Sequence, residues 1–142
     1  MTSDLTSTVA VRRILLADDA FDSRQLLGRL LCSLTRAEVI EARDGIDAIA
    51  RFELAKPCIT FLDIDMPRRT GLQVLEQIRA TDPRAFVVIV SGHGALEDVH
   101  AAVALGVGGF IVKPYSTRRV VDMLAQYCAT RSDAKLMRVA AA

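Results

Sequence analysis

The sequence predicts an α/β fold in which a parallel sheet is covered on both faces by helices. Two observations support this: five short apolar segments rich in Val, Ile and Phe, and five amphipathic segments that alternate with them. A third is the length of 142 residues, 51% hydrophobic and 25% charged, which suits about one domain with a substantial core. Strict alternation indicates parallel strands, because parallel neighbours are usually joined by crossover helices.

Each element can be placed in order along the chain. The predicted strands are apolar runs bounded by Asp, Gly or Pro: RRILLAD (12–18), AEVIEA (37–42), CITFLDI (58–64), AFVVIVSG (85–92) and GGFIVK (108–113). The predicted helices have apolar residues three or four positions apart: Leu27, Leu30, Leu31 and Leu34; Ile46, Ile49 and Ala50; Leu72, Leu75 and Ile78; Leu96, Val99 and Val103; and Val120, Val121, Leu124, Tyr127 and Cys128. The domain is expected to span residues 11–129, between a flexible N-terminus (1–10) and a loose C-terminal tail (130–142).

Charge and cysteine content narrow the classes of function. The net charge of +1 and the scattered Arg doublets predict no nucleic-acid partner. Cys32, Cys58 and Cys128 lack metal-site spacing and are interpreted as buried thiols, which favours the cytoplasm. No signal-peptide region and no apolar run of membrane-spanning length is present, so neither export nor membrane insertion is expected.

Polar residues follow four of the five predicted strands. They are Asp18 and Asp19; Asp63 and Asp65; Ser91 and His93; and Lys113 before Pro114. Taken singly, each has an ordinary explanation as a helix cap, a turn hydroxyl or a surface lysine. In an open parallel sheet, however, ligands bind at the carboxyl ends of the strands, so these residues are expected to share one site.

The residue types at these strand ends indicate a chemistry. Converging carboxylates repel one another unless a cation joins them, and an Asp-rich site of oxygen ligands suits Mg²⁺. A serine hydroxyl and a lysine ammonium beside such a metal would suit a phosphoryl group in transfer. The sequence therefore predicts Mg²⁺-assisted phosphoryl transfer onto an Asp carboxylate.

Four motifs, ILLADDA, LDIDMPRRTGL, VVIVSGHG and FIVKPYS, resemble those of receiver domains of two-component response regulators, which include the single-domain chemotaxis regulators. The resemblance covers about residues 12–128. It implies a flavodoxin-like, doubly wound five-stranded sheet of order 2-1-3-4-5 with five helices. It also implies a histidine kinase or histidine phosphotransfer protein as phosphoryl donor, and a downstream protein that binds the face formed by the fourth helix, fifth strand and fifth helix.

The resemblance assigns the acidic residues to metal binding and phosphorylation. Asp63 matches the phosphoacceptor and contributes to the metal site. Asp19 matches a direct Mg²⁺ ligand and Asp18 a ligand through water. Asp65 is expected to offer its backbone carbonyl to the metal, with its carboxylate turned to solvent after the strand has ended.

The remaining site residues are assigned in the same way. Ser91 and Lys113 match the hydroxyl and the ammonium that bind the phosphoryl group, and Ser91 together with Phe110 matches the switch positions. The Lys113–Pro114 peptide matches the family's cis bond. Asp65 and His93 flank the expected path of water to the phosphoryl group, so they are expected to tune its lifetime. Thr70 stands where the family commonly has Asp.

Two alternatives remain open. LDIDMPRRTG also resembles the nucleophile motif of haloacid-dehalogenase-type phosphatases, but those enzymes place an acidic pair after the lysine, whereas here Asp18 and Asp19 precede Asp63. The second alternative is a pseudo-receiver, an interaction module that is not phosphorylated. The expectation is a protein that assists only its own phosphorylation and dephosphorylation and is otherwise not an enzyme.

Overall fold

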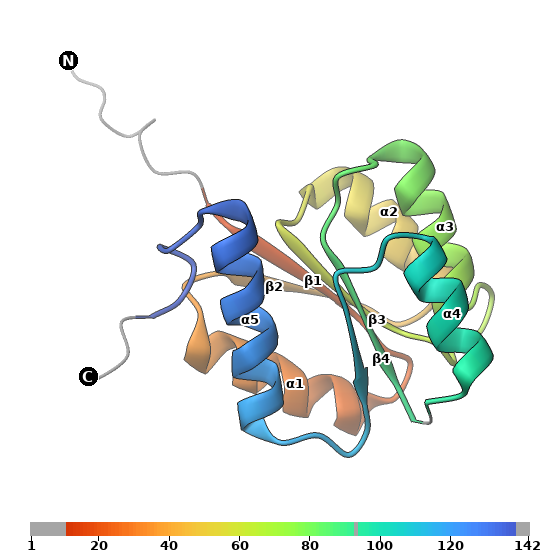
Figure 1. Ribbon diagram of the computed structural model, residues 1–142, viewed down its shortest axis with the longest axis horizontal. Helices are drawn as coiled ribbons and strands as arrows, with labels where there is room; N and C mark the ends of the chain where they lie inside the picture. Colours follow the sequence, from red (N-terminus) through yellow and green to blue (C-terminus); the bar gives the residue numbers. More distant parts are fainter. Residues whose placement is uncertain (1–10, 93, 139–142) are drawn as a thin grey trace.

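A computed structural model describes residues 11–92 and 94–138 as a single sheet with helices on both sides (Figure 1). The elements are, in chain order, β1 (Arg13–Ala17), α1 (Phe21–Leu34), β2 (Glu38–Ala42), α2 (Gly45–Ala55), β3 (Ile59–Asp63), α3 (Gly71–Thr81), β4 (Val87–Ser91), α4 (Leu96–Ala104), β5 (Gly109–Val112) and α5 (Thr117–Arg131). All strand pairs are parallel, and the order is β2-β1-β3-β4-β5. The predicted class, strand order and element sequence are confirmed.

The strands are apolar throughout because both faces of the sheet are covered. Helices α1 and α5 pack on one face, and α2, α3 and α4 on the other (Figure 1). In β1, Ile14 and Leu16 face the first layer while Leu15 and Ala17 face the second, and none is more than 2% exposed. None of the described helices is long and apolar enough to cross a membrane.

The start of α3 fits closely against the end of β3. Thr70 caps the helix: its hydroxyl accepts from the backbone N–H of Gln73, and the Gln73 side chain accepts from the N–H of Thr70. A Cβ atom at Gly71 would overlap the carbonyl oxygen of Asp63, so this position requires glycine. Thr70 thus has a structural role at the position where receiver domains commonly have Asp.

The expectation of a loose tail from residue 130 is wrong for residues 130–138. Helix α5 continues to Arg131, and Ser132, with φ of 54°, turns the chain back. Leu136 is fully buried in the core between α1, α5 and the sheet, and Met137 forms an antiparallel bridge with Thr35. Residues 132–135, three of them polar, separate Leu136 from the helix, so hydrophobic periodicity does not indicate its burial. The expectations for 1–10 and 139–142 lie outside the described residues.

An ion pair fixes the same segment to the start of β1. Asp133 accepts from Arg12 Nε at 2.7 and 2.8 Å and from the Tyr127 hydroxyl at 3.0 Å. The hydrogen bond from Arg12 lowers the pKa of Asp133, although burial opposes it. The pair therefore joins the beginning of the domain to the segment that follows α5.

We expect Leu136→Ala to lower the free energy of unfolding by about 2–5 kcal/mol, because a fully buried leucine is lost and a cavity remains. Urea denaturation measures this change. Leu96→Ala is the matched control, since that side chain is 69% exposed and its loss should change stability by less than about 0.5 kcal/mol. Equal effects of the two substitutions would contradict the packed position of residues 132–138.

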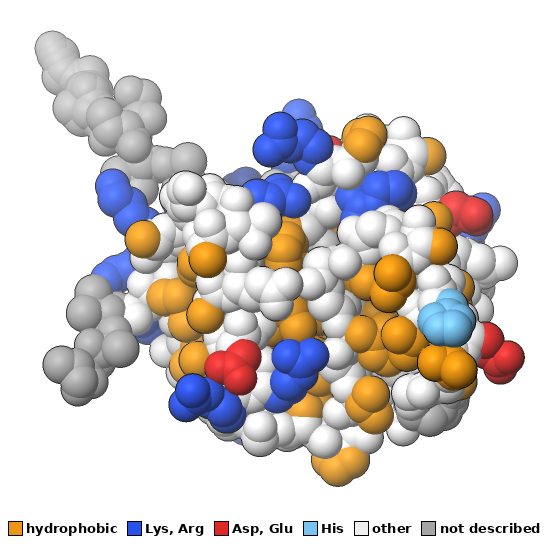
Figure 2. Space-filling view, in the orientation of Figure 1, with side chains coloured by type: hydrophobic (Ala, Val, Ile, Leu, Met, Phe, Trp, Pro, Cys, Tyr) orange, Lys and Arg blue, Asp and Glu red, His pale blue; other side chains and the backbone are white. Residues whose placement is uncertain are grey.

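Helix α4 does not bury the apolar stripe that the sequence predicted. Leu96 and Val103 are 69% and 64% exposed, Val99 is half-buried, and the small Ala102 is the buried residue of the helix. Ala102 packs in the core layer that also contains residues of α3 and the sheet, while Leu96 and Val103 face outward. Hydrophobic side chains accordingly gather on the surface over α4 (Figure 2).

The three cysteines are free thiols, but they are not all buried as expected. Cys32 is exposed, whereas Cys58 and Cys128 are half-buried. Cys32 comes directly after Leu31, which faces the core, and so points away from it. Burial raises the pKa of Cys58 and of Cys128, which keeps both thiols protonated.

Candidate functional site

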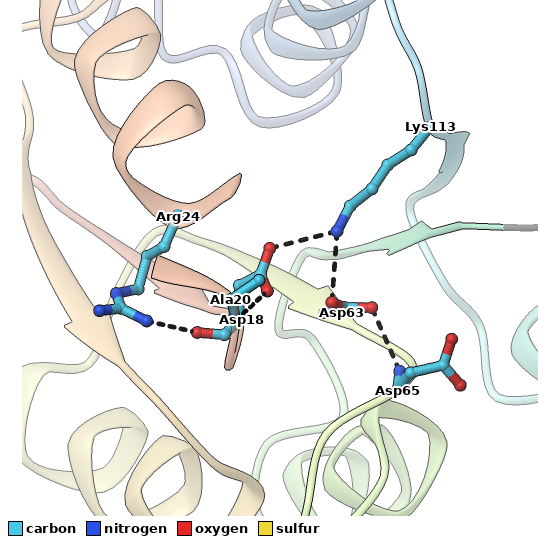
Figure 3. Close-up of polar contacts among 6 residues, drawn as sticks. All are labelled: Asp18, Ala20, Arg24, Asp63, Asp65 and Lys113. Carbon is cyan, nitrogen blue, oxygen red and sulfur yellow. Dashed lines mark hydrogen bonds and ion pairs between the residues drawn. The ribbon is translucent and has the colours of Figure 1, made fainter. Parts of the chain in front are cut away.

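The carboxyl ends of three strands converge on one group of charged side chains (Figure 3). Asp63 is the last residue of β3, Asp18 follows β1, and Lys113 follows β5. Strands β1 and β3 are neighbours at the centre of the sheet, and the helices that follow them cover opposite faces. This is the point at which a doubly wound sheet opens a crevice for a ligand.

Lys113 bridges two buried carboxylates. Its Nζ lies 3.2 Å from Asp18 Oδ2 and 3.3 Å from Asp63 Oδ2. Burial alone lowers the pKa of Lys113, but the charges of Asp63 and Asp18 raise it by more, so the net pKa is above its usual value. The lysine is therefore a permanent cation between the two acids. The Lys113–Pro114 peptide is cis, as expected.

A third carboxylate completes a possible metal site. Asp18, Asp19 and Asp63 each offer an oxygen, and these oxygens lie within 4.8 Å of one another. Asp18 and Asp63 are buried, while Asp19 is exposed at the mouth of the site. Oxygen ligands that are partly buried and partly open to water suit Mg²⁺, which keeps several of its waters.

The second acid of the LDID motif has a different position. The backbone N–H of Asp65 donates to Asp63 Oδ1 at 3.1 Å, but its carboxylate is exposed and points away from Lys113 (Figure 3). The turn after β3 thus separates the two acids, as the sequence predicted. Only Asp63 of this pair presents its carboxylate to Lys113.

The electrostatics distinguish the two buried acids. Burial raises the pKa of Asp63 to about 6, with the charge of Asp18 adding to the rise and Lys113 opposing it. Burial also raises the pKa of Asp18, but hydrogen bonds from Ser23 and from the Ala20 N–H, together with Lys113, lower it by more. At neutral pH two buried anions share one cation, and a divalent ion would neutralise the excess charge.

We expect the metal-free protein to lose stability as the pH rises from about 4 to 6. In this range the folded protein keeps a proton on Asp63 that the unfolded chain has already released, so unfolding is favoured as the pH increases. A rise in pKa from 3.8 to about 6 corresponds to at most about 3 kcal/mol. Chemical denaturation against pH, compared between wild type and Asp63→Asn, isolates this group. Parallel pH profiles of the two proteins would contradict the assignment.

The other predicted residues lie on the adjoining strands. Ser91 ends β4 and is fully buried, and Phe110 lies in β5, half-buried against the layer that contains α3 and α4. The backbone carbonyl of Phe110 accepts from Arg119 Nη2 at 3.0 Å. His93 lies outside the described residues, so its expected role has no structural test.

Sequence reasoning missed two residues beside the site. Arg24, which is 6% exposed, donates from Nη1 to the carbonyl oxygen of Asp18 at 2.8 Å and from Nε to Glu41 at 2.7 Å. Glu41 lies at the end of the second strand, the one strand end that the sequence does not assign to the site. A signal was present: Arg24 lies three and seven positions before Leu27 and Leu31, on the buried stripe of α1.

The fold and the site together define a doubly wound α/β domain with an acidic, lysine-bridged pocket at the centre of its sheet. A family model, the response regulator receiver domain, matches residues 14–125. The chain belongs to the receiver-domain family of two-component signalling.

Individual relatives agree with this assignment. The chain is 37% identical over 112 residues to the chemotaxis protein CheY of Listeria monocytogenes, covering 79% of this chain and 94% of that protein. Among solved structures, it is similar to the N-terminal domain of an uncharacterized protein from Wolinella succinogenes, with a TM-score of 0.78, 28% identity and coverage of 87% and 98%. A chain in the CheX–CheY–BeF₃–Mg²⁺ complex from Borrelia burgdorferi gives a TM-score of 0.75 at 26% identity, with coverage of 84% and 89%.

Proposed function

We propose that this chain is a phosphorylation-activated switch that accepts a phosphoryl group on Asp63, with Mg²⁺, from a histidine kinase or a histidine phosphotransfer protein. The supporting observation is the position of Lys113 Nζ between Asp63 and Asp18, beside three carboxylates that can share a metal. The free thiols favour a reducing compartment, and we therefore place this activity in the cytoplasm.

The residues present suit this transfer. A carboxylate oxygen of Asp63 forms the new bond to phosphorus as the bond from phosphorus to the donor's histidine nitrogen breaks, and the electron pair of that bond returns to the nitrogen. Lys113 and the Ser91 hydroxyl meet the negative charge on the phosphoryl oxygens. Asp19, Asp63, the carbonyl of Asp65 and, through water, Asp18 would hold Mg²⁺, which supplies further charge neutralisation.

The first test is the covalent product. Acetyl phosphate and Mg²⁺ should add one phosphoryl group to the intact protein, detectable by mass spectrometry, and little should be added without Mg²⁺. A pseudo-receiver would give no product under either condition. A haloacid-dehalogenase-type phosphatase would instead hydrolyse phosphomonoesters over many turnovers, and no acidic pair follows Lys113 in the sequence to support that chemistry.

We expect Asp19→Asn to weaken Mg²⁺ binding at least about ten-fold, because an anionic ligand is replaced by a neutral one. Asp19 is exposed, so the fold should be unaffected. Calorimetric titration measures the affinity, with Asp22→Asn, another exposed acid nearby in α1, as control. Binding should also weaken as the pH falls below about 6, where Asp63 takes up a proton. An unchanged titration in Asp19→Asn would contradict the site.

The signalling surface we propose is the face formed by α4, β5 and α5. Leu96 and Val103 of α4 and Val112 of β5 are exposed large hydrophobic residues, at 69%, 64% and 44%. Exposed apolar side chains over one element are typical of a surface that a protein partner covers. A downstream protein would thus bind this face when Asp63 is phosphorylated. We propose that Asp65, at the mouth of the site, influences how long the phosphoryl group persists.

A further inference from the structure

A buried arginine, Arg24, lies next to Asp18 on the side away from Lys113 (Figure 3). Arg24 extends from the first turn of α1 back to the end of β1, where Nη1 donates to the carbonyl oxygen of Asp18 at 2.8 Å. Its Nε donates at 2.7 Å to Glu41 of β2, and its guanidinium carbon lies 5.7 Å from the ring centre of Phe21. One side chain thus connects α1, β1 and β2.

The carbonyl that Arg24 holds belongs to the peptide between Asp18 and Asp19. On the other side of the same residue, the N–H of Asp18 donates to Ala42 O at 3.1 Å, as the last backbone bond of the β1–β2 ladder. The orientation of the Asp18–Asp19 peptide sets the position from which the Asp19 side chain begins. Asp19 is exposed, so its own burial does little to hold it near Asp18 and Asp63.

The positive charge of Arg24 does not interact directly with the carboxylates of the metal site. Its Nε is paired with Glu41, and its contact with Asp18 is to the backbone oxygen and not to the carboxylate. A cation near a Mg²⁺ site would also oppose metal binding by repulsion. A contribution of Arg24 to the site is therefore geometric.

We propose that Arg24 is a positioning residue that holds the Asp18–Asp19 peptide so that the Asp19 carboxylate meets Asp18 and Asp63 at the metal site. This inference rests on the proposed function, and it predicts the direction in which Mg²⁺ affinity changes when the guanidinium is removed. Loss of the guanidinium weakens Mg²⁺ binding if Arg24 acts by position. Loss strengthens binding if Arg24 acts mainly as a nearby positive charge.

The test compares Arg24→Met, Arg24→Lys and the control Arg29→Met, which removes an exposed arginine from the same helix. Mg²⁺ affinity is measured by calorimetry on the full chain, and the fraction folded is measured separately without metal. We expect Arg24→Met to weaken Mg²⁺ binding by about ten-fold or more, the range seen when residues that orient metal ligands are lost. Arg24→Lys retains the charge but not the two-armed geometry, so it should also weaken binding, and Arg29→Met should not.

A second readout needs no metal. Hydrogen exchange of the amides of residues 18–20 should be at least about ten-fold faster in Arg24→Met, with α5 unchanged, because the peptide has lost one of its holding bonds. A folded Arg24→Met protein with wild-type or tighter Mg²⁺ affinity would overturn the proposal. If Arg24→Met does not fold, wild-type affinity in Arg24→Lys would overturn it equally. Failure of the wild type to bind Mg²⁺ would instead refute the proposed function, and this inference with it.

Discussion

Asp63→Asn should abolish labelling by acetyl phosphate, whereas Asp65→Asn should leave it in place. The structure separates the two acids of the LDID motif by environment. The Asp63 carboxylate is 8% exposed and 3.3 Å from Lys113 Nζ, while that of Asp65 is exposed and directed away from the lysine. The amide of Asn is not a nucleophile toward phosphorus under these conditions, so the expected loss is complete.

The fold should survive this substitution. Asn has nearly the shape of Asp, and its carbonyl can still accept the N–H of Asp65. Above about pH 6 the variant should even be more stable than wild type without metal, because a buried anion has been removed. Circular dichroism and denaturation therefore distinguish lost chemistry from lost structure. Labelling that persists in Asp63→Asn and disappears in Asp65→Asn would show that the phosphoacceptor is misassigned.

The sequence was sufficient for the sheet and for most of the site because the relevant signals are local. Strand ends are visible as apolar runs that stop at Asp or Lys, and the topology of a parallel sheet brings those ends together. Asp18, Asp63 and Lys113 could be placed together for this reason. The strand order that sets β1 beside β3 came from the resemblance to receiver domains, and the distances and burial of these side chains came from the structure.

The features that sequence analysis missed depend on contacts between distant segments. Leu136 and Met137 form only a short apolar pair, and the burial of Leu136 follows from a turn at Ser132 that no periodicity indicates. Arg24 is buried because Asp18 and Glu41 supply acceptors from two other strands. In α4 the expected pattern was present, but the helix buries Ala102 in the core layer and leaves Leu96 and Val103 outside. Periodicity predicts that an element forms, and the neighbouring elements decide which side is covered.

Phosphorylation should change hydrogen exchange mainly in residues 91–103 and around Phe110. The phosphoryl group adds up to about two negative charges, and Ser91 and Lys113 can each meet it with a charge-assisted hydrogen bond worth roughly 1.5–3 kcal/mol. Inverting a 1:99 equilibrium between two conformations of the protein takes about 5.5 kcal/mol. Two such bonds therefore shift most of the molecules to the second conformation. Movement of Ser91 toward the group would open space into which Phe110 can turn, where burial favours it.

Helix α4 is held unequally at its two ends, which determines where the change should appear. Its N-cap, Ala95, makes no side-chain capping bond, and Gly92 and Gly94 lie just before it. At its C-terminal end, Arg79 of α3 donates to the carbonyls of Leu105 at 2.8 Å and Gly106 at 3.0 Å. We therefore expect the N-terminal part of α4 to move more than its C-terminal end, where Arg79 holds the chain.

The measurement is hydrogen exchange by mass spectrometry with and without beryllofluoride and Mg²⁺, a stable mimic of the phosphoryl group. We expect the largest differences in peptides from 91–103, a smaller one at 104–107 where Arg79 holds the chain, and a further change at Phe110. Asp63→Asn is the control, because it should remove the anchoring carboxylate and with it every difference. A response confined to Asp18–Arg29, or equal along the whole of α4, would show that this helix does not pivot about its C-terminal end in response to the site.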